Sequence, residues 1–343
     1  MPALDNRVMS AAARFSPRTL GLGAAVITVL VWTAFIVIAH ASASRSLTPF
    51  DIAFARICGA SLVLIPWGAW IVARDRDPAR RSMFGLSPLP LRLTATAGIF
   101  GGLAYALLAY TGFFFAPATH ASVLMPGSLP LWTALLAAIV LRDRITPGRA
   151  LGLLLIVLGD LFVGGGSLLH ALEGGVIWKG DLLFMSAAFC WASYSVVARK
   201  HGLDPVRATI AITVFAFMTY VPVYALLAAT GVVASRLGTA PLGEIAFQMF
   251  FQGIGSVVIS GITFTRMVQY FGPVRTTMIT ALVPGLSALG AVVFLAEPLQ
   301  WNLIAGLMLV TAGILFGVQR VGAGGVVPQA SVPARAAGGG ADA

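Results

Sequence analysis

The stretch LGLLLIVLGDLF at residues 151–162 recurs, with related residues in the same order, as AGLMLVTAGILF at residues 305–316. Glycine and proline positions repeat as well: the aligned pairs are Gly152 with Gly306, Gly159 with Gly313, and Pro130 with Pro284. A second match sets VWTAFIVIA at 31–39 against CWASYSVVA at 190–198, so that Trp32 aligns with Trp191. We therefore expect two copies of one structural unit, an arrangement that is typical of transporters when the protein lies in a membrane.

Composition indicates a membrane protein. Apolar residues make up 58% of the 343 residues, charged residues only 10%, and the mean hydropathy is +0.92. These values lie outside the range of soluble domains. Runs long enough to cross a bilayer recur along the chain. We predict an all-α integral membrane protein with ten transmembrane helices, at residues 20–42, 48–73, 92–114, 118–141, 147–166, 178–199, 206–231, 243–269, 275–296 and 300–319.

Positive charge is distributed unevenly over the predicted topology. With the N-terminus in the cytoplasm, 18 of the 22 lysines and arginines fall in cytoplasmic segments and three in outer segments, while Arg56 lies inside a helix. This excess follows the positive-inside rule and predicts a multi-pass protein of the bacterial cytoplasmic (inner) membrane with both termini in the cytoplasm. The net charge of +10 is explained by topology, so we expect the lipid bilayer as a partner and no nucleic acid.

Five helices per copy have a consequence for the symmetry of the molecule. A unit of five spans that begins inside ends outside, so the next unit is inserted upside down. We expect two inverted-topology five-helix repeats, at 20–166 and 178–319, joined by a periplasmic connector at 167–177. A cytoplasmic segment at 1–19 precedes them, and a disordered cytoplasmic tail at 320–343 follows. Halves related in this way can expose a central site to either side in turn.

Longer motifs accompany the repeat. Each half begins with a Trp-containing helix, and TPFDIAFARICGA at 48–60 carries Arg56. The second half contains GDLLFMSAAFCWASYSVVARK at 180–200 and LVPGLSALGAVVFLAEPLQWNLIAGLMLVTAGILFGV at 282–318. By these motifs, residues 20–164 and 178–318 resemble the two EamA domains of the drug/metabolite transporter superfamily. The first half departs from the family's usual glutamate at the end of the fourth helix, where LRDRIT places Asp143. The resemblance implies a ten-helix transporter of small organic metabolites.

Interrupted helices near the centre of the membrane are expected to form the substrate site, because they leave backbone groups free. Proline removes an intrahelical hydrogen bond and marks such breaks. The hinge candidates are Pro126, Pro130 and Pro284, with simple packing kinks as the alternative. The alignment of Pro130 with Pro284 favours a shared mechanical role.

Aromatic and polar side chains away from the helix ends are the candidates for a substrate cavity. Trp and Tyr usually lie at membrane interfaces, and an ionisable group inside a span is a functional candidate by default. An aromatic cavity suits amino acids with large side chains, aromatic metabolites or organic cations, while Arg56 could attract a carboxylate or phosphate. Bundle packing and snorkelling are the alternatives. The cavity candidates are Trp32, Arg56, Tyr105, Trp191, Tyr194 and Gln252.

Asp160 is the deepest carboxylate of the predicted helices, and its repeat partner is Ile314. It is the candidate coupling group, with protons as the coupling ion. A neutral, hydrogen-bonded acid that faces another helix is the alternative. Tyr110 is expected at the membrane interface. For His120, a contribution of hydrogen bonds and an interfacial place are the two alternatives.

The sequence favours a carrier over other classes of membrane protein. It contains no HExxH, GxSxG or P-loop motif and no concentrated cluster of His, Asp and Glu, so we expect no enzyme, no metal and no cofactor. We predict a secondary active exporter or exchanger of small organic metabolites such as amino acids, which works by alternating access as a monomer or homodimer. A passive channel and a membrane-embedded enzyme are the alternatives.

Overall fold

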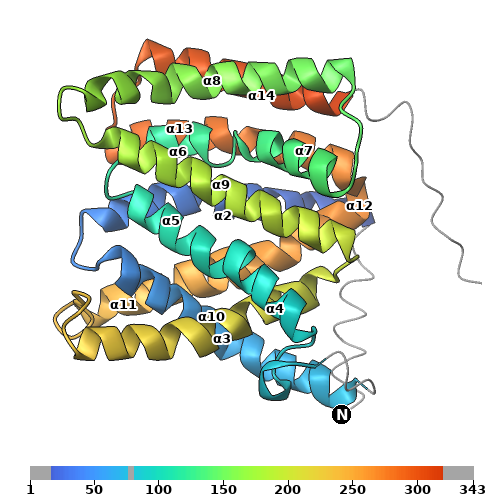
Figure 1. The fold of residues 1–343 in the computed structure, drawn as a ribbon, viewed down its shortest axis with the longest axis vertical. Coiled ribbons are helices and arrows are strands. Elements are labelled where there is room, and N and C mark those ends of the chain that lie inside the picture. The colour runs from blue at the N-terminus through green and yellow to red at the C-terminus, as the bar shows by residue number, and fades with distance from the viewer. Residues whose placement is uncertain (1–16, 76–80, 320–343) are drawn as a thin grey trace, which may run out of the picture.

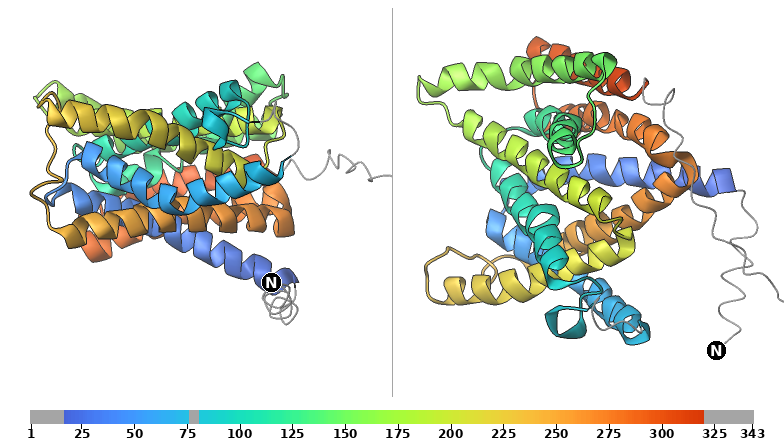
Figure 2. Two further views of the ribbon diagram at one scale, coloured as in Figure 1. Left: turned by 90° about the horizontal axis from the view of Figure 1, so that it is seen from below. Right: turned by 45° about the vertical axis from the view of Figure 1, so that its right-hand side comes forward.

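The computed structural model describes residues 17–75 and 81–319 of the chain. The predicted N-terminal segment at 1–19, apart from its last three residues, and the predicted tail at 320–343 lie outside this range. All regular structure within the range is helical, and the helices form one bundle (Figures 1 and 2). The start of α2 (Pro17–Ala43) and the end of α14 (Trp301–Gln319) lie at the same end of this bundle (Figure 1).

Several helices begin with a capping residue that is followed by proline. This pattern starts α3 (Pro49–Arg74), α8 (Pro147–Ala171) and α10 (Pro205–Ala229), with Thr48, Thr146 and Asp204 as the caps. Each cap oxygen accepts a hydrogen bond from a free N–H group of the first turn, and proline has no N–H group to leave unpaired there. These helix starts therefore follow from local sequence.

The remaining helices complete two similar halves. The first half also contains the short turn η2 (Met83–Gly85), α4 (Leu91–Gly98), the π-helical η3 (Ile99–Leu103), α5 (Ala104–Gly112), α6 (Ala118–Leu124) and α7 (Leu129–Val140). The second half also contains α9 (Ile177–Lys200), α11 (Leu242–Gln248), the π-helical η4 (Met249–Ile259), α12 (Ser260–Thr280) and α13 (Leu282–Leu295).

Eight helical segments of the described chain are long and apolar enough to cross a membrane. They coincide with the first eight predicted helices, and two shorter apolar helices, Leu282–Leu295 and Trp301–Gly317, lie where the last two were predicted. One predicted boundary is wrong. A break was expected between residues 269 and 275, at the Gly-Pro dipeptide, but α12 continues to Thr280 and α13 begins after Ala281. A proline inside a membrane helix is tolerated, so the dipeptide alone did not mark the helix end.

The helix contacts keep the same pattern when each helix is replaced by its counterpart in the other half. Helix α2 contacts α12 and α13, as α9 contacts α5 and α7. Helix α3 contacts η4, as α10 contacts η3 and α4. Two pairs join corresponding helices directly, namely α3 with α10 and α8 with α14. The α8–α14 pair forms one edge of the bundle (Figure 1).

The repeated glycines are the contact points of α8 and α14. A Cβ atom at Gly152 would lie 2.6 Å from the carbonyl oxygen of Gly313, and one at Gly313 would lie 2.5 Å from that of Gly152. Gly159 and Gly306 face each other in the same way, at 2.7 and 2.8 Å. Gly152 thus contacts Gly313, the copy of Gly159, and Gly159 contacts Gly306, the copy of Gly152. Reciprocal contacts of this kind are typical of elements related by a two-fold axis.

Candidate substrate site

Arg56 lies where α3 and η4 approach each other most closely. A Cβ atom at Gly59 would lie 2.0 Å from the carbonyl oxygen of Met249, and one at Gly253 would lie 2.8 Å from the carbonyl oxygen of Arg56. Neither position can accept a side chain without moving a backbone. This contact places the half-buried Arg56, about 10 Å along α3 from its start at roughly 1.5 Å per residue, against the π-helical segment.

The guanidinium group of Arg56 belongs to a hydrogen-bonded network. Its Nη1 donates to the hydroxyl oxygens of Tyr110 and Ser256, both at 3.2 Å. The hydroxyl group of Tyr110 donates in turn to Oε1 of Gln252 at 3.0 Å. Phe35 of α2 also places its ring centroid 5.7 Å from the guanidinium carbon of Arg56. Among the described residues, no carboxylate forms an ion pair with Arg56, so its charge is met only by neutral groups.

The site residues stand beside the two π-helical segments. η3 precedes Tyr105 and Tyr110, whereas η4 contains Gln252 and Ser256. π-Helical turns widen a helix locally and occur often at functional sites. The segments occupy corresponding places in the two halves, since each lies in the third membrane-crossing helix of its half.

The aromatic candidates form a second cluster. The rings of Tyr105 and Trp191 lie 5.1 Å apart between centroids, and those of Trp191 and Tyr194 lie 5.5 Å apart. Tyr105 lies on α5, as does Tyr110 of the Arg56 network, so the two clusters share this helix. Trp32 stacks instead on Phe264 of α12, at 5.2 Å. All four candidate rings are half-buried.

Tyr110 was predicted at the membrane interface, and that prediction is wrong. Its side chain is only 1% exposed and lies at the centre of the Arg56 network. Helix α5 packs against α9 on one side and against α3 on another, so residues on different faces of α5 are buried. Of the two alternatives for His120, the structure has the hydrogen bond: the residue is buried and its Nδ1 lies 2.8 Å from Oδ1 of Asp181.

The hinge candidates lie at breaks between helices. Pro126 lies in the turn at residues 125–128 that separates α6 from α7, and Pro130 lies in the first turn of α7. Pro284 lies in the first turn of α13, directly after the break at Ala281. In the repeat alignment, these two interruptions fall at corresponding places.

Both interrupted helices end in the same backbone turn. Arg142 and Ala296, which correspond in the repeat, have left-handed φ angles of 57° and 54°. The next residue in each case is acidic, and its N–H group donates to a carbonyl oxygen six residues earlier, at 3.3 Å. Asp143 then pairs with Arg199 at the end of α9, and Glu297 with His40 near the end of α2. These two corresponding acid–base pairs therefore lie at opposite ends of the bundle.

The two ends differ in how tightly these pairs are held. The side chain of Glu297 is 9% exposed, and its oxygens also accept hydrogen bonds from the N–H groups of Ala118 and Thr119 at 2.7 and 2.8 Å. The side chains of Asp143 and Arg199 are 28% and 60% exposed. Glu297 thus links the start of α6 to the end of α13 at the His40 end. At the opposite end, the Asp143–Arg199 pair is exposed.

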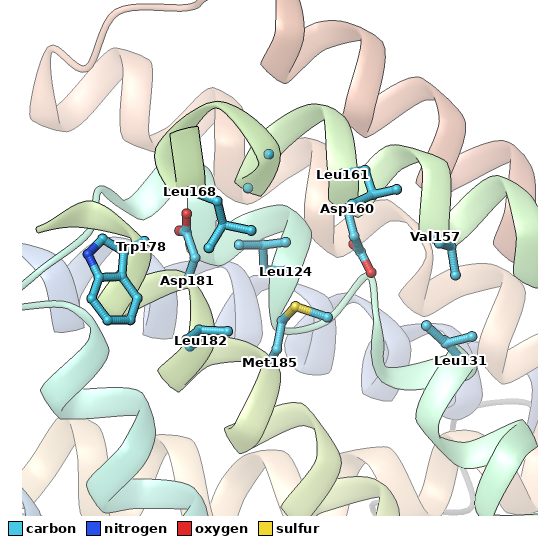
Figure 3. A pocket seen from close by; sticks show the side chains of 12 residues that line it. Leu124, Leu131, Val157, Asp160, Leu161, Leu168, Trp178, Asp181, Leu182 and Met185 are labelled. Atoms are coloured by element: carbon cyan, nitrogen blue, oxygen red, sulfur yellow. The ribbon is translucent and has the colours of Figure 1, made fainter. Parts of the chain in front are cut away.

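Asp160 lies apart from the Arg56 network, in a cavity of about 120 Å³ between α8, α9 and the α6–α7 break (Figure 3). Its carboxylate points toward the space between Met185 and Leu131 (Figure 3). The residue is 6% exposed, and both carboxylate oxygens are buried without a hydrogen-bond partner. Asp181 lines the same cavity and is paired with His120 and with the hydroxyl group of Ser167.

Comparison with known proteins adds a family relationship to this geometry. The sequence model of the EamA-like transporter family matches residues 19–165 and 178–318. The chain is 26% identical over 237 residues to the uncharacterised transporter YyaM of Bacillus subtilis. This aligned region covers 67% of this chain and 75% of that protein. It is 27% identical over 196 residues to an uncharacterised transporter of Archaeoglobus fulgidus, and this aligned region covers 56% of this chain and 62% of that protein. A crystal structure with a TM-score of 0.54 and 22% identity covers 89% of this chain and 99% of the other, and shares its fold.

Proposed function

The chain belongs to the EamA-like transporter family, and from that premise we propose that it carries small organic metabolites with a carboxylate group across the membrane by secondary active transport. The family and the transporter names of the relatives point to a membrane transporter of the drug/metabolite superfamily rather than to an enzyme. Substrate, mechanism and energy source are the parts that we propose.

The observation that carries the substrate proposal is the unpaired charge of Arg56. An arginine inside a membrane span is costly unless it meets an opposite charge or water. Among the residues that the structure describes, it donates only to the hydroxyl groups of Tyr110 and Ser256. A guanidinium group binds a carboxylate through two parallel hydrogen bonds, so a substrate carboxylate would supply the missing partner. Arg56 is therefore the proposed anion-binding residue.

The aromatic cluster supports the choice among carboxylates. Tyr105, Trp191 and Tyr194 present half-buried rings close to one another. Such rings bury large apolar groups well and interact with cationic groups over their faces. Amino acids with large side chains combine a carboxylate, an ammonium group and an apolar part, so they are the proposed substrate class.

Alternating access is supported by the symmetry of the contacts. Exchange of the two halves preserves the helix pairing, and the glycines of α8 and α14 contact each other reciprocally. We infer ten membrane-crossing helices in two inverted repeats, with the two shorter helices α13 and α14 as the last spans. The acid–base pairs at the two ends then act as gates, and the tight Glu297 contacts support a state closed at the His40 end. With the termini in the cytoplasm, as we propose, the His40 end faces outward.

Proton coupling through Asp160 is a subsidiary proposal. Its test is substrate uptake into proteoliposomes with and without an imposed pH gradient, for the wild type and for Asp160→Asn. We expect the gradient to raise uptake in the wild type only. Equal uptake with and without the gradient in both proteins would exclude protons as the coupling ion.

The main test uses Arg56. A thermal-shift screen of amino acids, aromatic metabolites, nucleosides and quaternary amines on the purified protein identifies a binder, because a ligand stabilises the folded state by mass action. We expect amino acids with large side chains to bind and to show saturable counterflow in proteoliposomes. Arg56→Gln should weaken binding by about tenfold or more, since a hydrogen bond to a charged group contributes about 1.5–3 kcal/mol.

The matched control is Arg266→Gln, because Arg266 is an exposed arginine of α12. It undergoes the same chemical change outside the site and should bind substrate like the wild type. Equal affinities of both variants would contradict the role of Arg56. Single-channel conductance without counterflow would contradict a carrier and identify a channel.

A further inference from the structure

None of the residues that line the cavity beside Asp160 (Figure 3) belongs to the Arg56 network or to the Asp143–Arg199 and Glu297–His40 pairs. We propose that it is a second binding site, and that its ligand is a lipophilic ammonium ion, meaning a protonated amine attached to a short apolar group. This site is distinct from the proposed substrate site and stands whether or not Arg56 binds a carboxylate.

The unpaired carboxylate of Asp160 defines the polar part of the ligand. Its two oxygens are buried, point into the cavity and accept no hydrogen bond from a described residue. A buried carboxylate without a partner is costly, and nearly all buried polar groups in proteins are paired. A ligand with several N–H donors and a positive charge would satisfy both oxygens and balance the charge. A protonated amine meets both requirements.

The other acidic residue of the cavity does not compete for the ligand. Asp181 is already engaged, since Oδ1 lies 2.8 Å from Nδ1 of His120 and Oδ2 accepts the hydroxyl group of Ser167. The free acceptors therefore belong to Asp160 alone, which predicts one ammonium group per site. A quaternary ammonium ion lacks N–H donors and would leave the Asp160 oxygens unpaired, so primary amines should bind better.

The walls of the cavity define the apolar part and the route of entry. Leu161, Leu168 and Leu182 line it and are 56%, 47% and 47% exposed. In a membrane-spanning helix, such exposed leucines face lipid, so the cavity opens toward the bilayer. A volume of about 120 Å³ leaves room for a short chain only. The ligand therefore enters from the lipid with its apolar group against these leucines and its ammonium group at Asp160.

The test measures binding of hexylammonium to the purified full-length protein by titration calorimetry. We expect the wild type to bind it, and Asp160→Asn to bind it at least tenfold more weakly. Hexan-1-ol and hexyltrimethylammonium, which lack the charge or the N–H donors, should also bind at least tenfold more weakly to the wild type. Glu173→Gln serves as the matched control, because Glu173 is an exposed acid just beyond the end of α8.

A second variant blocks the cavity and leaves Asp160 in place. A Cβ atom at Gly164 would lie 3.8 Å from Oδ2 of Asp181 and 3.9 Å from a methyl group of Leu124, both of which line the cavity. Gly164→Leu should therefore fill the space and abolish hexylammonium binding, so the test holds even where Asp160→Asn fails to fold. Arg56→Gln should retain this binding, which separates it from the substrate site. Equal affinity of the wild type and either cavity variant, or no binding to the wild type, would overturn the proposal.

Discussion

Tyr110 connects three helices through a single hydroxyl group. It accepts a hydrogen bond from Arg56 of α3 and donates one to Gln252 of η4, whose side chain is fully buried. Tyr110→Phe would leave the Gln252 oxygen without a donor. A buried unsatisfied group costs about 1–3 kcal/mol, so we expect this loss in the free energy of unfolding and weaker substrate binding as Arg56 loses an anchor.

The measurement is thermal denaturation of purified protein together with a substrate titration. Tyr270→Phe is the matched control, because Tyr270 lies on α12 outside this network and is 40% exposed. A Tyr110→Phe protein as stable as this control, with unchanged substrate affinity, would show that the network does not hold Arg56.

Single residues show where sequence reasoning ends. Arg56 and Gln252 were predicted as cavity candidates, and they meet in one network through Tyr110, which was predicted elsewhere. Asp51 was not selected at all, although it is fully buried and accepts hydrogen bonds from Thr48, Tyr224 and Ser235 and from the N–H group of Arg236. The local part of this cluster, the Thr48–Asp51 capping box, is visible in the sequence. Its distant partners are not, because they depend on how α3 packs against the loop after α10.

The contact between helices α8 and α14 allows a test of whether the repeated glycines stabilise the fold. A Cβ atom at Gly159 would lie 2.7 Å from the carbonyl oxygen of Gly306 and 2.6 Å from a methyl group of Val310. Gly159→Ala must therefore push the two helices apart. Overpacking of this kind costs about 1–3 kcal/mol, and we expect that loss in thermal denaturation.

Gly165→Ala is the matched control on the same helix, since a Cβ atom there would have no neighbour within 4 Å. Alanine is favoured over glycine in helices by about 1 kcal/mol, so this variant should be as stable as the wild type or slightly more stable. If both alanine variants behave alike, the glycine contacts do not hold the α8–α14 pair together.

Element positions could be predicted where the signal is local. Apolar runs of bilayer length located the first eight spans close to where the structure has them. The π-helical segments η3 and η4 and the end of α12 at Thr280 had no such signal. A π-helical turn depends on which neighbour presses on the helix, as α3 does on η4 at Gly253, and single-chain periodicity does not record that neighbour.

At the scale of the whole molecule, the two ends differ in how their corresponding acidic residues are held. The acid–base pairs Asp143–Arg199 and Glu297–His40 occupy corresponding positions, and each follows a left-handed residue. Only Glu297 also accepts hydrogen bonds from the start of a helix, at Ala118 and Thr119. In an alternating-access carrier, exchange of the two halves would tighten one end while the other loosens. The difference in hydrogen bonding between the two ends would then show which end is closed in this conformation. It would not mean that the two repeats are built differently.

Glu297→Gln should consequently open the His40 end. The substitution removes the charge that pairs with His40 and weakens two charge-assisted hydrogen bonds to α6. Bonds of this kind contribute about 1.5–3 kcal/mol, which corresponds to a tenfold or larger rise in the population of a minor open state. The probe is a single cysteine at the half-buried Ser256, in a protein whose Cys58 and Cys190 are replaced by alanine. We expect a membrane-impermeant maleimide added at the outer face to label Glu297→Gln faster than the wild type.

Asp143→Asn is the matched control, because it removes an acid from the opposite end. It should leave labelling from the outer face unchanged and instead raise labelling from the cytoplasmic face in inside-out vesicles. Two gates that respond at opposite faces are what inverted halves require, since each acid then controls one entrance to the same central site. Labelling that rises at one face for both variants would place both acids at a single entrance and contradict the inverted arrangement itself.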